Sequence, residues 1–492
     1  MSTDKAVMKK ILDDTVRFWL DCDNQTNVFV EFKNNQGAVY FEPIGSTYFL
    51  AALGCRYREE TGEDDVLPNF SELLAVKSQQ VIFERQNMVS INHRVAGSLN
   101  SRIAYFLADE QRRTVVVEPD GWKIVVKAKE KFVKREADLP QVRPTRGGNC
   151  LTLLRPYVNL SDDDFKLLVI WLIQAFSRES SHNALVISSA KGTGKSTLTK
   201  LLRSLIDPSL SDASLTPSND GDLKNLLANT FMACFDNTAS MRENYSNILC
   251  AAITGTKESK RKLYTDCDQI ILNLHNVVVL NGIDIVPYKS DLSERSLLFE
   301  LQKITADKRM TDHDFWSGFQ ADKPAILGAI FDTLQKAMQI LQTLQVKELA
   351  RMADAYQEMV AIALALDIPQ AKFERIYKAN QGRLQASYIQ NNPFIEFVVS
   401  YVGRRKRIDE PAQKLYEDMY ECKGKGGNYF PDSPTALSRR LNLERDALEE
   451  AGISFSRHKR SDANYIRLEK IAQNQMTKKQ KATAGPLAST DE

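Results

Sequence analysis

The stretch Ala184-Leu-Val-Ile-Ser-Ser-Ala-Lys-Gly-Thr-Gly-Lys-Ser-Thr197 decides how the middle of this chain is expected to fold. Its first four residues predict a short buried strand, a glycine-bearing loop follows, and the leucines from Leu198 to Leu205 predict an amphipathic helix. A strand, a loop ending in Gly-Lys-Ser and a helix, in this order, are the context of a phosphate-binding loop. We therefore expect an α/β fold with a parallel sheet.

This loop predicts a site for a nucleoside triphosphate, with ATP and Mg²⁺ as the cofactors. Backbone N–H groups of the loop and of the helix N-terminus would face the phosphates. Lys195 would add positive charge, and the Ser196 hydroxyl would coordinate Mg²⁺. The residues assigned to nucleotide binding are Ser189, Ala190, Lys191, Gly192, Thr193, Gly194, Lys195, Ser196 and Thr197.

One position departs from the usual pattern, because Ser189 stands where glycine is favoured for its backbone freedom. Serine is small and tolerates turns, so we interpret the loop as a variant. The alternative is a chance glycine loop in an α/β protein, which the predicted strand and helix around it disfavour.

Composition limits the class of protein. A chain of 492 residues implies two to four domains, and a net charge of +2 means that any nucleic-acid surface must be local. Its seven cysteines include no C-x-x-C pair, which suits a reducing cytoplasm and argues against a zinc finger. The N-terminal stretch is polar and no apolar run approaches the length of a membrane span, so we expect neither a signal peptide nor a membrane partner.

The predicted organisation has five segments. Residues 1–150 mix strands and helices and form an α+β domain, with a collar, DNA-loading or partner-binding role as the default. Residues 151–305 form the α/β core, residues 306–392 a helical lid, residues 393–470 a winged-helix domain, and residues 471–492 a disordered tail. In the first segment, Asp21-Cys22-Asp23 follows a helix-like stretch from Ile11 to Leu20, so we interpret it as a helix end and not as a two-metal site.

Two polar residues after the loop could complete a catalytic site. Asp236 ends the apolar run Phe231–Phe235 and is the expected Mg²⁺ carboxylate; the alternative is a turn cap. Asn237 stands where many ATPases carry glutamate, and it can position water but cannot act as a base. Glu243 could contribute. Asn281, at the end of Val277–Leu280, is interpreted as a γ-phosphate sensor; the alternative is an Asn-Gly turn.

Arg295 precedes another apolar run and could reach the nucleotide of a neighbouring subunit, although a surface ion pair is the alternative.

The glycine loop, Asp236, Asn281 and Arg295 follow one another along the chain. In this order the motifs resemble those of the AAA+ superfamily 3 helicases, and more closely the replication helicase-ATPases of phages, prophages and integrated genomic islands. The resemblance covers roughly residues 115–470. It rests on the motif order and on the segments Leu263–Asp266, Asn281–Ile283, Arg351–Asp354 and Tyr377–Asn380.

The resemblance implies roles for single residues. It makes Ser189–Thr197 the Walker A loop, Asp236 the Walker B carboxylate and Asn281 sensor 1. It makes Arg295 an arginine finger that acts in trans, and Arg351 sensor 2. In such helicases the basic segment after Thr254 lines a central pore, which implies DNA contacts through Lys257, Lys260, Arg261 and Lys262; the alternative is a solvated basic loop.

The last folded segment is interpreted as a winged helix. Helices are expected over Pro434–Leu441 and Leu443–Ala451, followed by a hairpin over Gly452–Arg460 and Asn464–Leu468. A winged helix that makes only protein contacts is the alternative. The expected phosphate contacts are Arg439, Arg440, Arg457, Lys459 and Arg460.

Together these features favour an ATP-dependent DNA helicase or replication-initiation ATPase of a phage or mobile element. It would form a homo-oligomeric ring, a hexamer, with single-stranded DNA in the pore, duplex at the winged helix and a separate primase or replication protein as partner. One alternative is an AAA+ switch or scaffold for regulation, transposition or defence that binds ATP without unwinding. A P-loop kinase fits Lys195 and Asp236 but not the lid or the arginine finger.

Overall fold

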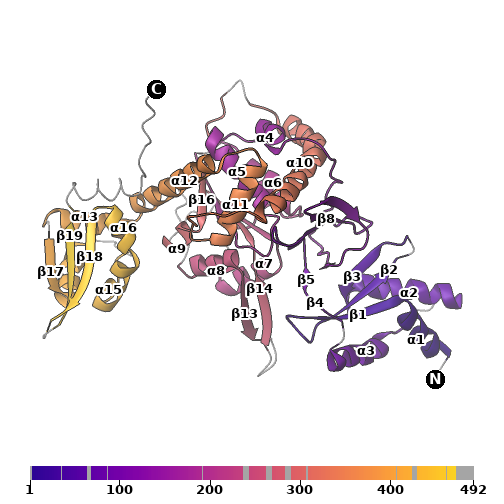
Figure 1. Ribbon diagram of the computed structural model, residues 1–492. Coiled ribbons are helices and arrows are strands. Elements are labelled where there is room, and N and C mark those ends of the chain that lie inside the picture. The colour runs from indigo at the N-terminus through magenta and orange to yellow at the C-terminus, as the bar shows by residue number, and fades with distance from the viewer. Residues whose placement is uncertain are drawn as a thin grey trace. The chain divides into compact units, whose positions relative to one another are not determined.

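The computed structural model describes thirteen stretches of the chain, which fall into two compact units (Figure 1). The first unit combines Met1–Ile285 with Arg295–Asn380, and the second combines Val286–Glu294 with Gln381–Glu492. The predicted tail lies outside the described residues beyond Ile471. The described residues are 3–34, 36–63, 68–85, 87–190, 192–215, 217–236, 243–261, 269–282, 290–305, 309–405, 407–423, 429–460 and 463–471.

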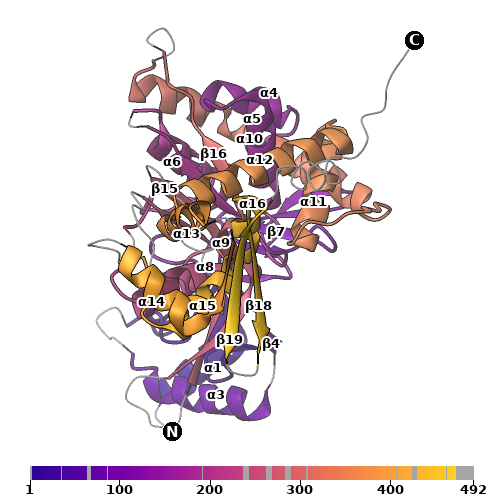
Figure 2. The same cartoon turned by 90° about the vertical axis from the view of Figure 1, so that its left-hand side faces the viewer.

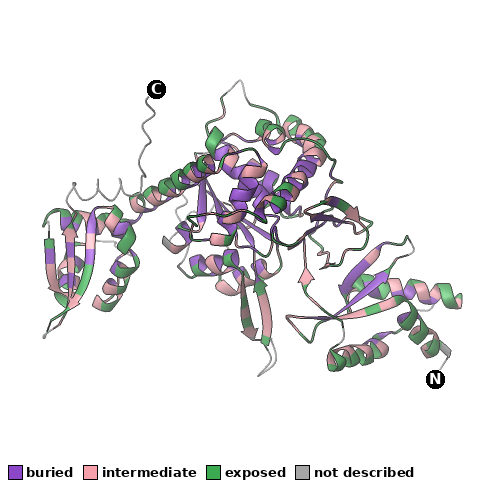
Figure 3. Cartoon of the chain, in the orientation of Figure 1, coloured by how far each residue is buried: buried purple, intermediate pink, exposed green. Residues whose placement is uncertain are grey.

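A four-stranded parallel sheet forms the centre of the first unit, and it confirms the expected mixed α/β class. Its order is β12 (Met232–Phe235), β15 (Val277–Gly282), β11 (Ala184–Ser188) and β16 (Ser296–Glu300). Because helices cover parallel sheets on both faces, these strands are continuous apolar runs and not alternating ones. Figure 3 shows them buried, together with most of α5 (Asp162–Gln174).

Helices pack around this sheet and extend beyond it. Where it is described, the stretch expected to be helical after residue 306 is mainly helical, and Thr311 caps the first of its helices by accepting from the Asp314 N–H. No described helix is both long and apolar enough to cross a membrane. The helices are α4 (Cys150–Leu154), α6 (Lys195–Ile206), α7 (Asp220–Ala228), α8 (Glu243–Thr254), α10 (Asp312–Leu341), α11 (Ala353–Ala365) and α12 (Gln370–Gln390).

The run Ile270–Leu274 does not join the parallel sheet. It belongs to β14 (Gln269–Leu274), which pairs antiparallel with β13 (Thr256–Arg261) in a two-stranded arm that projects from the core (Figure 1). We call these two strands the β13–β14 arm. β13 is polar throughout its length, and β14 is buried only at Leu274, so most of the arm is at least partly exposed to solvent.

The N-terminal region contains a second four-stranded sheet, of order β3-β2-β1-β4. The predicted helix over Ile11–Leu20 was wrong at its end, because α1 (Thr3–Thr15) stops and β1 (Val16–Asp21) begins. Pairing of β1 with β2 overrides the helical pattern. The other elements are β2 (Val28–Lys33), β3 (Val39–Pro43), α2 (Thr47–Thr61), α3 (Ser71–Glu84), β4 (Met88–Val89), β5 (Ile91–Asn92), β6 (Val95–Gly97), β7 (Ile103–Phe106), β8 (Thr114–Glu118), β9 (Gly121–Val125) and β10 (Lys131–Phe132).

The second unit contains a three-stranded antiparallel sheet, of order β17-β19-β18, with helices beside it (Figure 2). The expected helix pair and hairpin are present as α15, α16, β18 and β19, whereas the edge strand β17 was not predicted. Its elements are α9 (Ser290–Ser293), the end of α12, α13 (Pro393–Gly403), β17 (Arg407–Pro411), α14 (Ala412–Cys422), α15 (Pro434–Leu443), α16 (Arg445–Glu450), β18 (Ile453–Lys459) and β19 (Asn464–Lys470).

Candidate nucleotide site

The glycine loop connects β11, which lies between β15 and β16 in the sheet, to the first turn of α6. Gly192 and Gly194 adopt φ angles of 78° and 90°, a region that disfavours residues with a side chain. Gly194 is the N-cap of α6 and makes no side-chain cap, so the first N–H groups of the helix point toward the loop. This arrangement suits an anion at the helix N-terminus.

The Lys195 side chain folds back over the loop. Its ammonium donates to the carbonyl oxygen of Ser189 at 2.6 Å and to that of Ala190 at 2.9 Å. Both acceptors are uncharged backbone groups, so neither of these two contacts is an ion pair. A phosphate could therefore replace these acceptors without breaking an ion pair.

Ser189 takes the place of the usual glycine without strain. It is absent from the described non-glycine residues that have positive φ. Its hydroxyl hydrogen-bonds the Thr193 hydroxyl, which in turn donates to the Ala190 carbonyl at 3.0 Å. Serine therefore closes the loop on itself, which glycine could not do.

Ser196 and Asp236 meet in front of the loop, although they are 40 residues apart in the sequence. The Ser196 hydroxyl donates to Asp236 Oδ2 at 3.3 Å. Asp236 follows β12, where its N–H donates to the Ser214 carbonyl at 3.1 Å. A hydroxyl and a carboxylate at this separation are suitable ligands for one Mg²⁺ ion.

Asn281 lies beneath the first turns of α6, fully buried, and opposite Ile187 of β11. Its amide nitrogen is 3.4 Å from the Thr199 hydroxyl, which itself donates to the Lys195 carbonyl at 3.1 Å. The Asn281 amide oxygen has no hydrogen-bond partner among the described residues.

A cavity of about 330 Å³ opens beside the loop and the start of α6. Thr193, Gly194 and Thr197 line one side, and mainly apolar side chains line the remainder. Tyr157 is fixed in this wall by donating to Asp322 at 2.6 Å, and burial together with this bond raises its pKa to about 12. The other lining residues are Arg155, Pro156, Val158, Asn159, Leu198, Leu301, Ile304, Arg309, Met310, Asp312 and Phe315.

Arg295 lies at the amino ends of the parallel strands, whereas the loop lies at their carboxyl ends. Strands β11 and β16 are parallel, with Ser296 opposite Ala184 and Glu300 opposite Ser188. The arginine precedes Ser296, whereas the loop follows Ser188, so about 13 Å of strand separates the two positions. The side chain is therefore badly placed to serve the site of its own chain.

Four further predicted residues are not part of the geometry described above. Arg351 is exposed and precedes α11. Lys191 and Asn237 lie outside the described residues, as does the Glu243 side chain.

Two of the predicted DNA residues on the β13–β14 arm already have partners. Lys257 pairs with Asp23, and the Lys260 ammonium donates to the Asn225 side chain at 2.9 Å. The Arg261 side chain and Lys262 lie outside the described part of the chain.

In the second unit, Arg439, Arg457, Lys459 and Arg460 have exposed side chains. Arg460 stacks on Tyr465 and pairs with Asp409 at 3.1 Å. Arg440 differs from the other four, because its guanidinium pairs at 3.0 Å with Glu444, a residue only 1% exposed. Its charge is therefore used inside the unit.

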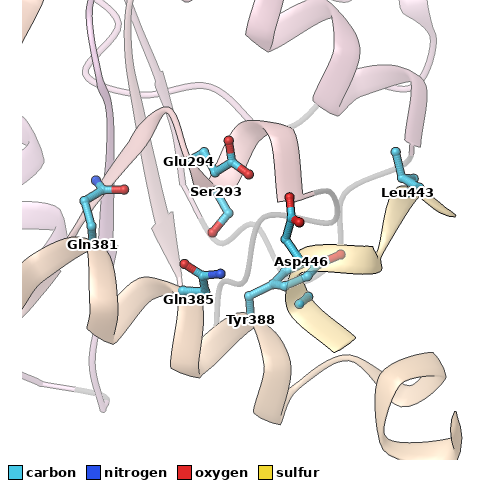
Figure 4. A pocket seen from close by; sticks show the side chains of 8 residues that line it. Ser293, Glu294, Gln381, Gln385, Tyr388, Leu443 and Asp446 are labelled. Carbon is cyan, nitrogen blue, oxygen red and sulfur yellow. The ribbon is translucent and has the colours of Figure 1, made fainter. Parts of the chain in front are cut away.

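A small pocket in the second unit is a poor candidate for a ligand site (Figure 4). Its volume of about 30 Å³ holds little more than a water molecule. Ser293 and Glu294, the two residues before Arg295 in the chain, line it. The other lining residues are Gln381, Gln385, Tyr388, Leu443, Asp446 and Ala447.

One protein family matches the region that carries the loop. The family is described as "Actinomycete integrative conjugative element replication protein", and the match covers residues 151–371, slightly under half of the chain. This region therefore resembles the replication proteins of mobile elements. No curated protein matches the chain.

Solved structures give a distant likeness over almost the whole chain. "The A form apo structure of NrS-1 C terminal region-CTR" is 12% identical, with a TM-score of 0.39, over 95% of this chain and 99% of that one. "The apo structure of NrS-1 C terminal region (305-718)" is 13% identical, with a TM-score of 0.39, over 96% of this chain and all of that one.

The residues that form the wall of the cavity were not predicted from the sequence. Arg155–Asn159 and Phe315 carry no motif, and they come to the loop only through the packing of α4, α5 and α10 around the sheet. A Pro-Tyr pair just before the Ser161 cap was the only local signal. It does not distinguish a ligand wall from a turn.

Proposed function

We propose that this protein is an ATP-dependent DNA helicase or replication-initiation ATPase of a phage or mobile element, of the AAA+ superfamily 3 kind. The observation that carries the proposal is the meeting of Ser196 with Asp236 in front of the glycine loop. In this proposal the loop is a P-loop: Lys195 would exchange its two carbonyl acceptors for phosphate oxygens, and Ser196 and Asp236 would hold Mg²⁺.

The cavity beside Gly194 would receive the base and ribose. Its mainly apolar wall suits a planar base, and its charged lining residues, Arg155, Arg309 and Asp312, suit the polar ribose. This lining supports a nucleotide as the proposed ligand over a free phosphate.

Arg295 is proposed to act on the nucleotide of the next subunit. A ring of identical subunits repeats one heterologous contact, so a residue remote from its own site can complete its neighbour's. An arginine that reaches the γ-phosphate stabilises the charge of the transition state and contributes about 10³-fold or more to turnover.

DNA contacts are proposed for the β13–β14 arm, through Lys257 and Lys260, and for the second unit interpreted as a winged helix. Support comes from the helices and three-stranded sheet of that unit and from its exposed Arg439, Arg457 and Lys459. The match of residues 151–371 to a mobile-element replication family also supports a role on DNA.

The first test is ATP turnover with and without DNA, for wild type, Lys195→Ala and Arg295→Ala. Lys195→Ala should lose ATP binding. Arg295→Ala should still bind ATP but turn over about a thousandfold more slowly. Lys200→Ala is the matched control, because Lys200 lies on the same helix and pairs with Asp212 on the surface.

Mixing the two inactive variants tests the shared site. In a random ring, about a quarter of the interfaces would join an intact loop to an intact Arg295, so activity should reappear. A mixture that stays inactive, while each variant still assembles, would contradict the assignment in trans.

Asn237 favours a second candidate, an ATP-binding switch or scaffold with slow hydrolysis, because asparagine cannot accept a proton as glutamate does. Forked duplexes of both polarities separate the two functions. Wild-type protein that binds ATP and DNA but unwinds neither fork would favour the switch.

A further inference from the structure

The turn between β1 and β2 contacts the β13–β14 arm, although more than 230 residues separate them in the sequence. The turn is held in shape by its own bonds. Asp21 accepts from the Asp23 N–H at 2.9 Å, and the Asn27 N–H donates to the Asn24 carbonyl at 2.7 Å. Asp23 and Asn24 are thereby presented to the arm.

Asp23 is held by a cross-strand pair. Lys257 of β13 lies opposite Asn273 of β14, and both side chains reach the same carboxylate. The Lys257 ammonium donates to Oδ1, and the Asn273 amide donates to Oδ2 at 3.4 Å. The bond to Asp23 raises the pKa of Lys257, so the lysine stays charged.

The Asn24 side chain hydrogen-bonds the backbone of β14 close to the Lys257–Asn273 pair. Its amide nitrogen donates to the Ile271 carbonyl at 3.1 Å, and its amide oxygen accepts from the Ile271 N–H at 2.8 Å. Both backbone groups of Ile271 therefore point outward from the arm and not toward β13. The side chain takes the place of a neighbouring strand and closes this free edge.

Side chains of α7 bind side chains at every second residue of β13. Lys224 pairs with Glu258 at 2.6 Å, and Asn225 accepts from Lys260. Because side chains alternate along a strand, Glu258 and Lys260 lie on the face opposite to Lys257. The arm is thus attached to the core on one face, and the contact with Asp23 occupies the other.

We infer that the Asp23–Asn24 turn is an internal clamp whose carboxylate competes with DNA phosphate for Lys257. This inference rests on the proposed function, because it takes the arm as a DNA contact. A carboxylate and a phosphate oxygen offer the ammonium the same kind of acceptor, and the carboxylate at Lys257 offsets the positive charge that would attract the phosphate. A phosphate contact through Lys257 is therefore stronger when the turn releases the arm.

The test measures binding of a fluorescein-labelled oligothymidylate by anisotropy, with full-length protein and a non-hydrolysable ATP analogue, over a series of salt concentrations. Asp23→Asn should bind about three- to tenfold more tightly. Its plot of log K against log salt should be steeper by about 0.7, the value for one further phosphate contact on a single strand. The gain should disappear in Asp23→Asn/Lys257→Gln.

Asp13→Asn is the matched control. Asp13 belongs to the same N-terminal region and pairs with Lys77 at 2.6 Å, so it removes one negative charge away from the arm. Its DNA affinity should equal that of wild type. An equal gain in Asp13→Asn would mean that only net charge matters, and it would overturn the clamp.

Hydrogen exchange checks the clamp without DNA. Asn24→Ala should speed exchange of the Ile271 amide while α7 stays protected. Wild-type binding with no gain in Asp23→Asn overturns the inference and leaves the proposed function standing. If neither wild type nor Asp23→Asn binds the oligonucleotide, both fall; ATP binding by wild type then shows whether the nucleotide site survives.

Discussion

Ser189 shows how a departure from a motif can be a local solution. Glycine at this position would give the loop freedom, but the serine backbone needs no positive φ, and its hydroxyl bonds Thr193. The position of the loop between a strand and a helix, and that of Asp236 directly after an apolar strand, could be predicted because a motif is a short-range pattern. The buried contact between Asn281 and Thr199 could not, since it depends on the distance between β15 and α6.

At this scale we predict that Ser189→Gly lowers the free energy of unfolding of nucleotide-free protein by about 1 kcal/mol. One hydrogen bond is lost, and the unfolded chain gains freedom. ATP affinity should change far less than in Lys195→Ala. Urea denaturation with and without ATP measures both effects, and loss of ATP binding in Ser189→Gly would show that the hydroxyl contacts the ligand.

Elements were predictable where their pattern was local. The apolar strands of the parallel sheet agree with the sequence, since continuous apolar runs are strong signals. The edge strand β17 was missed because its sequence, Arg-Ile-Asp-Glu-Pro, buries only Ile408. The helix over Ile11–Leu20 was overextended because strand pairing, which acts at long range, decides where α1 ends.

A buried ion pair connects the start of β6 to the end of α6, two elements that are far apart in the sequence. Arg94 lies just before β6, is 1% exposed, and pairs at 3.1 Å with Asp207, the fully buried C-cap of α6 that is 113 residues away. Burial alone would raise the pKa of Asp207, but the charges of Arg94 and Arg135 hold that pKa below its usual value.

We predict that Arg94→Met lowers the free energy of unfolding by about 3 kcal/mol, because it leaves a buried carboxylate short of its partner. Arg102→Met is the control: Arg102 pairs with Glu118 and Glu130 at about a third of full exposure, and its loss should cost less than about 1 kcal/mol. Equal shifts in thermal unfolding for the two variants would refute this ranking.

At the scale of the whole molecule, stability depends on polar groups buried between elements of the first unit. Glu358 of α11 is 1% exposed and accepts from the Ser177 hydroxyl at 2.7 Å, the Ser180 hydroxyl at 2.6 Å and the Gln174 amide at 3.1 Å. These donors lie on α5 and on the turn that leads to β11, so one carboxyl joins α11 to the strand that carries the loop.

Burial raises the pKa of Glu358 from 4.5 to about 7, and the three donors only partly oppose this shift. A raised pKa in the folded state gives stability that is fully present below pH 4.5 and is lost as the pH rises through about 7. The loss should reach roughly 3 kcal/mol.

We therefore predict that Glu358→Gln removes this part of the pH dependence, so that its stability relative to wild type increases between those two pH values. Glu348→Gln, at an 84% exposed side chain, is the control for general titration. Urea midpoints at closely spaced pH values measure the difference, and parallel curves for Glu358→Gln and wild type would mean that the carboxyl is already ionised and paired in the fold.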